Sequence, residues 1–179
     1  MDLSKTVRLA FCGIITAICT MAMFLTGLIS IGTYALPAFA GILLIVVVIE
    51  LGAGWAWPVY LASSLLSLLL AGDKEAAMLF IIFFGYYPIL KAYFERIHQR
   101  FLSWLLKFAV FNAAMILGFF LSIKVLGVPE DSFTVFGVYL PWAFLAAGNC
   151  VFVVYDYAIS SLVGMYFQRF HRFVGKWLK

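Results

Sequence analysis

Six long apolar runs dominate this sequence and restrict what the chain can fold into. An α-helix of about 20 mostly apolar residues crosses the hydrocarbon core of a bilayer, and each run is close to that length or longer. Over the whole chain 66% of the residues are hydrophobic and only 11% are charged, which is too apolar for a soluble fold. The sequence therefore predicts an all-α integral membrane protein, a bundle of six transmembrane helices. The predicted spans cover residues 7–30, 35–51, 54–71, 76–95, 102–126 and 137–166.

Short polar breaks separate the spans, and no long linker divides the chain. The breaks read SIGTY, ELGAG, AGDKE, ERIHQR and VPEDSF, and each contains Gly, Pro or a charged residue. We therefore expect residues 1–179 to form a single six-helix membrane domain. Its last part, residues 167–179, interleaves aromatic and basic residues at spacings of three and four, which predicts a basic amphipathic tail on the membrane surface.

The lysines and arginines lie almost entirely on one side of the predicted membrane. With the N-terminus placed in the cytoplasm, only Lys74 and Lys124 fall at outer ends of spans. The others fall at inner ends: Lys5, Arg8, Lys91, Arg96, Arg100, Lys107, Arg169, Arg172, Lys176 and Lys179. Because cytoplasmic loops carry an excess of Lys and Arg, this bias predicts that both termini are cytoplasmic. Charges confined to the ends of spans report orientation, so we expect no nucleic-acid partner.

Sequence motifs for common catalytic chemistry are absent. The chain contains no GxxxxGK[ST] phosphate-binding loop, no HExxH, no GxSxG and no cluster of Cys and His. His98 and His171 both lie in basic segments without a second ligand nearby, so a metal site is not expected. We therefore predict that the protein is not an enzyme and carries no cofactor.

Few polar residues lie inside the spans, and most of them share one stripe of the last span. Trp142, Asn149 and Asp156 are seven residues apart, and Ser160 follows Asp156 by four. These spacings keep the side chains on one helical face, which we expect to point into the bundle. Asn112 lies near the middle of the fifth span. A charged group at mid-membrane costs roughly 2.5–3.5 kcal/mol, so such residues are candidates for a function.

Asp156 lies in the inner third of the last span, by the 1.5 Å rise of a helix per residue. Lys91 and Lys107 approach the same depth from the fourth and fifth spans. The preferred interpretation is a structural ion pair of Asp156 with these lysines that holds the last helix to its neighbours. Two alternatives stay open, namely coupling to a cytoplasmic partner and direct contact with a substrate.

Polar residues in the outer half are the candidates for binding a small molecule, because they can line a cavity open to the outside. They come from the last two spans, from the kink-prone segment FFGYYPILK and from the outer loop AGDKEAAM. The candidate substrate-binding residues are Asn112, Trp142, Asn149, Tyr86, Glu75 and Lys74. The alternatives are that the two asparagines form hydrogen bonds between helices and that the loop is a solvated turn whose acid caps the next helix.

The first span carries a face of small residues. Gly13 and Ala17 are four residues apart, and Ala10 lies close to the same face. Small residues at this spacing let two helices approach closely. The sequence allows two interpretations of this face, packing within the bundle or docking to another protein.

This pattern resembles the substrate-binding S components of energy-coupling factor (ECF) vitamin transporters. The resemblance lies in the length, the six spans, the short second span and the basic start of the first span, TVRLAFCGIITAI, with its small-residue face. It implies a bacterial plasma-membrane protein that binds a vitamin or similar small molecule near the outer face. The partners it implies are a membrane coupling protein and two cytoplasmic ATPases. The family often docks through an AxxxA face on its first helix, and here Gly13 stands in the first of those positions.

Two other classes have the same outline. Rod-shape membrane scaffolds of the MreD type are similar in size and number of spans, but they bind proteins and not solutes. A small lipid-handling or channel protein is a third possibility. An S component predicts a closed, solute-sized cavity in the outer half, lined by the last three spans and by the loops after the first, third and fifth spans, whereas a scaffold predicts that side chains fill this region.

Overall fold

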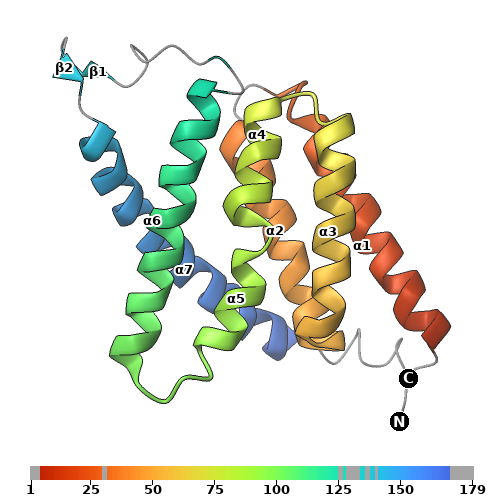
Figure 1. Ribbon diagram of the computed structural model, residues 1–179. Coiled ribbons are helices and arrows are strands. Elements are labelled where there is room, and N and C mark those ends of the chain that lie inside the picture. Colours follow the sequence, from red (N-terminus) through yellow and green to blue (C-terminus); the bar gives the residue numbers. More distant parts are fainter. Residues whose placement is uncertain are drawn as a thin grey trace.

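The computed structural model describes residues 5–29, 32–124, 127, 134–135, 138–139 and 141–169, and these form a bundle of helices (Figure 1). The helices are α1 (Lys5–Leu25), α2 (Gly32–Leu51), α3 (Ala53–Leu70), α4 (Lys74–Leu79), the π-helix η1 (Phe80–Phe84), α5 (Tyr87–Phe94), α6 (Arg100–Lys124) and α7 (Pro141–Arg169). Two short strands, β1 (Thr134–Val135) and β2 (Val138–Tyr139), pair antiparallel before α7. Within the described residues, six segments are long and apolar enough to cross a membrane, with α4, η1 and α5 forming one of them. This confirms the predicted helical class and the number of candidate spans.

Basic residues gather at one end of the bundle, where α1 begins and α7 ends (Figure 1). The residues concerned are Lys5, Arg8, Lys91, Arg96, Arg100 and Lys107. We call this the basic end. Lys74 begins α4 and Lys124 ends α6 at the opposite end. The predicted amphipathic tail, beyond Arg169, lies outside the described residues.

Three helix boundaries differ from those expected. The first helix ends at Leu25, because the N–H groups of Thr26 and Gly27 bond three residues back in a turn. The second begins at Gly32, so Pro37 lies inside the helix and not in its first turn. The last begins at Pro141, after the β1–β2 pair. Apolarity marks the span, but local hydrogen bonds decide where each helix starts and stops.

The fourth span is interrupted by η1 near its middle. The N–H of Gly85 donates to the carbonyl of Phe80, five residues back, at 2.8 Å. Pro88 has no N–H that could donate a hydrogen bond to the carbonyl of Phe84. The helix is therefore wider and kinked at this point. The hydroxyl of Tyr60 on α3 donates to the carbonyl of Ile81 at 2.7 Å and satisfies a backbone group within the bulge. The sequence predicts a kink, and the structure adds its π-helical form.

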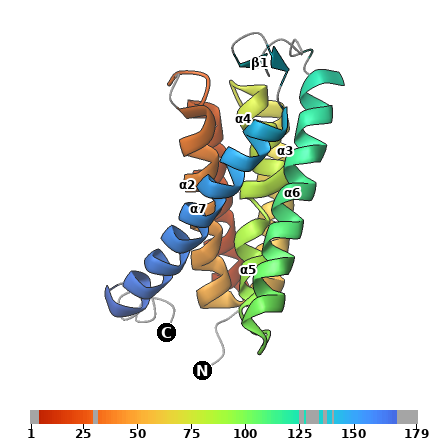
Figure 2. The ribbon, with the colours of Figure 1, turned by 90° about the vertical axis from the view of Figure 1, so that its left-hand side faces the viewer.

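Two buried clusters hold the bundle together. One joins α1, α2 and α3 and includes Cys19, Leu44 and Val59. The other is aromatic and joins η1, α5, α6 and α7, with Phe111 and Phe152 stacked at 4.6 Å between ring centroids. Helix α7 runs obliquely across the face of the bundle, so it meets α6 along only part of its length (Figure 2).

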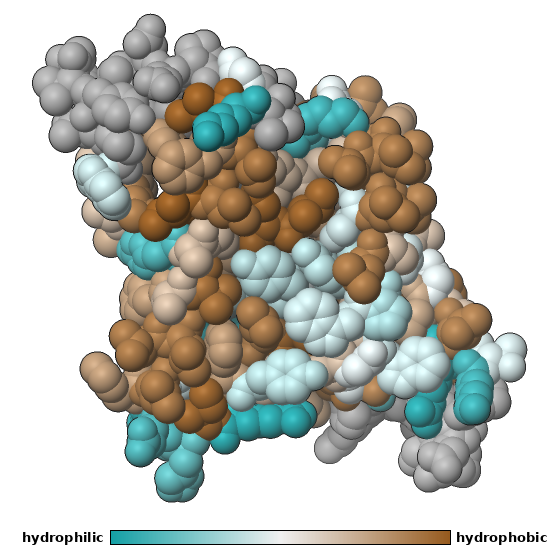
Figure 3. All heavy atoms as spheres, in the orientation of Figure 1, coloured by the Kyte–Doolittle hydropathy of each residue, from teal (hydrophilic) through white to brown (hydrophobic). Residues whose placement is uncertain are grey.

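The surface is unusually apolar for a folded chain (Figure 3). Large side chains such as Leu61, Leu65 and Leu69 are exposed on α3. The ring of Tyr60 on α3 meets those of Trp57 and Tyr86 edge to face, at 5.9 and 6.0 Å between ring centroids. Extensive exposed apolar surface of this kind fits a protein whose surroundings are lipid.

Gly27 and Gly72 form the closest backbone contact at the end opposite the basic end. A Cβ added at Gly72 stands 2.5 Å from the Cα of Gly27, and backbone atoms cannot move aside without a large cost.

We predict that Gly72→Ala lowers the free energy of unfolding by about 1–3 kcal/mol through overpacking. Denaturant titration in detergent micelles measures the effect. Gly54→Ala is the matched control, because nothing lies within 4 Å of its added Cβ. Equal stability of the two variants would contradict this packing.

Candidate functional site

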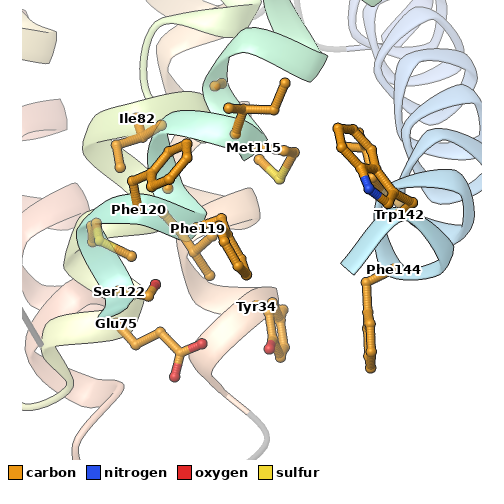
Figure 4. Close-up of a pocket in the computed structure, with 16 residues that line it drawn as sticks. Tyr34, Glu75, Ile82, Met115, Phe119, Phe120, Ser122, Trp142 and Phe144 are labelled. Carbon is orange, nitrogen blue, oxygen red and sulfur yellow. The ribbon is translucent and has the colours of Figure 1, made fainter. Parts of the chain in front are cut away.

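An apolar cavity of about 310 Å³ lies between α4, α6 and α7, toward the end opposite the basic end. In Figure 4, Trp142 and Phe144 of α7 face Met115 and Phe119 of α6 across the space. Ile82 of η1 lines it from the side of the fourth span. The volume is near the lower limit of roughly 300–1,000 Å³ that is usual for small-molecule pockets.

Two glycines on the wall keep this space open. An added Cβ at Gly118 on α6 comes no closer than 3.9 Å to another side chain, that of Ile82. At Gly148 on α7 the nearest contact is the ring of Phe111 at 3.4 Å. Both glycines line the cavity, so a larger residue at either position takes up space at its wall.

The polar groups of the cavity come from the first turns of α2 and α4 and the last turns of α6. They are Tyr34, Glu75 and Ser122. The carboxylate of Glu75 forms no hydrogen bond or ion pair with any described residue. It lies with Tyr34 at one end of the cavity, while Ile82 and Met115 lie toward the other (Figure 4). The site therefore has one charged end and one apolar end.

Asp73 explains why Glu75 stands where it does. Its Oδ1 accepts from the N–H groups of Glu75 at 2.9 Å and Ala76 at 3.3 Å, which caps the N-terminus of α4. Its Oδ2 accepts from the hydroxyl of Thr33 at 2.7 Å, which ties this turn to α2. Asp73 thus caps α4, as the sequence allowed for the loop acid, and Glu75 in the first turn of α4 has a carboxylate without a hydrogen-bond partner among the described residues.

Asp156 is the centre of a second polar site, nearer the basic end. It is 3% exposed, and its two partners Lys91 and Lys107 are 2% and 4% exposed. Nζ of Lys91 lies 2.5 Å from Oδ1, and Nζ of Lys107 lies 3.0 Å from Oδ2. The hydroxyl of Tyr87 donates to Oδ1 at 2.5 Å. Glu95, 2.8 Å from Lys91, balances the second positive charge. The network joins α5, α6 and α7.

A separate cavity of about 350 Å³ opens beside this network from the basic end. Glu95, Lys107 and Asp156 are on its wall, together with Arg100 and Trp104. None of these residues lines the apolar cavity. Asp156 is therefore reached from the basic side, and it makes no contact with the apolar cavity on the other side.

Asn112 and Asn149 hold α6 and α7 to each other. Each amide NH₂ donates to the other residue's oxygen at 2.9 Å, in a reciprocal pair. Each also donates to a carbonyl in its own helix at 2.8 Å, that of Phe108 or Leu145. Neither asparagine lines the apolar cavity. The arrangement is the interhelical pair that the sequence allowed as an alternative to ligand binding.

The candidate ligand residues therefore separate into two groups. Glu75 and Trp142 line the apolar cavity. Lys74 turns away and donates to the carbonyl of Leu68 at 3.0 Å, and Tyr86 packs against Tyr60 with 6.0 Å between ring centroids. Depth along a helix can be read from the sequence, but the direction of a side chain depends on how the helices are rotated in the bundle.

Most of the cavity wall has no polar signal in the sequence. Met115, Phe119 and Phe144 are ordinary apolar residues of a span and cannot be told from lipid-facing ones. Gly118 and Gly148 are wall residues that the sequence does distinguish, because glycine inside a helix often has a packing or functional reason. Within the described residues, no group of three or more His, Cys, Asp or Glu could hold a metal ion.

The small-residue face of α1 does not pack within the described part of the bundle. Ala10, Gly13 and Ala17 are all exposed, and no atom lies within 4 Å of a Cβ added at Gly13. The opposite face, which includes Ile15 and Cys19, packs into the core. If this face packs within the bundle, its neighbour is not among the described residues.

Comparison of the chain with protein-family models, with curated proteins and with solved structures found no match.

Asp156→Asn removes the buried carboxylate that pairs with both Lys91 and Lys107 and leaves the half-exposed Glu95 as their shared acidic partner among the described residues. We predict a loss of roughly 3–5 kcal/mol in the free energy of unfolding, because two buried lysines then share a single carboxylate. Thermal and denaturant unfolding in detergent test this. Glu75→Gln is the control, since that carboxylate is exposed and has no partner among the described residues, and it should change stability by less than about 0.5 kcal/mol. Unchanged stability of Asp156→Asn combined with lost uptake would show a functional role instead.

Asn112 and Asn149 should be coupled to each other and not to a ligand. A double-mutant cycle with Asn112→Ala and Asn149→Ala is expected to give a coupling of about 0.6 kcal/mol, the average for polar pairs between membrane helices. Retention of a bound small molecule, measured by native mass spectrometry, should be the same in both variants. Loss of the ligand from a folded Asn149→Ala protein would place this pair in the binding site.

Proposed function

We propose that this chain is the substrate-binding component of an ECF-type importer, which takes up a vitamin-like small molecule from outside a bacterial cell. The observation that carries the proposal is the apolar cavity between α4, α6 and α7. Its position at the end opposite the basic end matters, because a positive-inside orientation puts that end outside the cell. A solute cavity facing outward is what a capture protein needs and a scaffold does not.

The partners follow from what the chain lacks and from what α1 presents. The sequence contains no phosphate-binding loop, so the energy for import comes from separate ATPases. The face of Ala10, Gly13 and Ala17 is exposed and flat enough for a helix of a membrane coupling protein to approach closely. In this proposal two surfaces have two tasks, with the cavity holding the solute and α1 docking the partner.

Two substitutions separate these tasks. Gly118→Trp places an indole in the cavity and should abolish retention of a small molecule, yet leave the complex with the coupling protein and ATPases intact. Gly13→Leu adds a side chain to the exposed face of α1 and should prevent the complex, yet leave ligand retention intact. Native mass spectrometry and affinity co-purification from the protein's own host measure the two properties on each variant.

The results also decide between an importer and a rod-shape scaffold of the MreD type. A scaffold predicts co-purification with cell-wall or cytoskeletal proteins, no ATPase pair and no retained solute. It also predicts that Gly118→Trp has no effect beyond stability. That set of outcomes would replace the importer proposal.

A further inference from the structure

The charged end of the apolar cavity indicates the chemical class of its ligand, an inference that rests on the proposed function. We propose that the ligand is a compact, largely apolar molecule, of the size of one or two rings, that carries one cationic group. The cation lies against the carboxylate of Glu75, and the apolar body lies between α6 and α7.

The negative charge of the cavity wall favours a cationic ligand. Among the described residues of the wall, Glu75 is the one with a charged side chain. Among the described residues no ion pair joins Glu75 to a lysine or arginine, and Lys74 donates instead to the carbonyl of Leu68. A carboxylate beside an apolar wall interacts more strongly with a cation than it does in bulk water. An anionic ligand is repelled there.

The aromatic side chains of the wall suit both a cationic group and an apolar ring. Tyr34, Phe119, Trp142 and Phe144 surround the space, and Tyr34 lies beside Glu75 at the charged end (Figure 4). Aromatic faces attract ammonium groups, and they also stack on flat apolar rings. The same wall thus suits both parts of such a ligand.

The volume of the cavity and the apolar character of its wall favour a compact, largely apolar ligand. A cavity of about 310 Å³ holds a compact molecule, and apart from the charged end the described residues of the wall offer few polar groups to orient a sugar or a chain of hydroxyls. A lipid acyl chain is the competing occupant, since it fits an apolar gap between helices. It leaves the carboxylate of Glu75 without a partner, and this difference is what the experiment measures.

The experiment compares three probes that share an indole ring and differ in charge: tryptamine, tryptophol and indole-3-propionate. Binding to the full-length protein is measured calorimetrically in nanodiscs of zwitterionic lipid, so that the membrane itself does not select a cation. Tryptamine should bind about tenfold more tightly than tryptophol, a difference of about 1.4 kcal/mol. Indole-3-propionate should bind most weakly. In Glu75→Gln the affinity for tryptamine should fall about tenfold, with that for tryptophol unchanged.

Glu50→Gln is the matched control. It removes the same charge at the basic end of α2, and the amide oxygen can still accept the hydrogen bond from Tyr166, which is 2.6 Å long with the carboxylate. The preference for tryptamine should persist in this variant.

Three results overturn the assignment: tighter or equal binding of the neutral or anionic probe, a preference that survives in Glu75→Gln, or no binding of any probe. A small molecule that wild type retains and Gly118→Trp loses still supports the proposed function in each of these cases. A retained lipid, insensitive to Glu75→Gln, identifies the acyl chain as the occupant. If no molecule is retained and no probe binds, the importer proposal fails together with the ligand class.

Discussion

A carboxylate buried between two lysines is the interaction on which the rest of this structure depends. Asp156 could not remain charged inside an apolar bundle by itself, because the loss of hydration far exceeds what packing returns. Lys91, Lys107 and the hydroxyl of Tyr87 replace the lost water, and they come from two different helices. The network therefore fixes the rotation and depth of α5, α6 and α7 relative to one another. Glu95 completes the charge balance from the surface.

The apolar cavity lies where α6 and α7 are no longer held to each other by polar contacts. Helix α7 is fixed to α6 at the network, and again by the pair of Asn112 and Asn149. Beyond that pair α7 continues obliquely, and Gly118 and Gly148 add no bulk to the space between the helices (Figure 2). Side chains such as Phe119 line the gap without closing it. The apolar cavity and the ion-pair network thus occupy separate regions of α6 and α7.

Sequence reasoning was most successful where a single property was sufficient. Apolar length predicted the six candidate spans, and the positions of Lys and Arg marked the end where α1 begins. The similar depth of Asp156, Lys91 and Lys107 along their helices predicted an ion pair, and the structure places their charged atoms within hydrogen-bond distance. The same reasoning could not separate Glu75, which lines the cavity, from the neighbouring Lys74, which turns away. Both have the same depth and the same loop, and only the path of the backbone distinguishes them.

The sequence by itself determined the helical class and the number of segments apolar enough to cross a membrane, because these depend on hydrophobicity summed over some twenty residues at a time. It also determined that Asp156 had to find a cationic partner, because the cost of leaving it alone is large. Only the tertiary structure decided which residues face a cavity and which face each other. Asn112 and Asn149 satisfy one another, and Phe119 and Trp142 line the cavity, because those outcomes depend on how the helices rotate and diverge. Rotation and divergence arise from contacts between segments far apart in the chain, which no local pattern records.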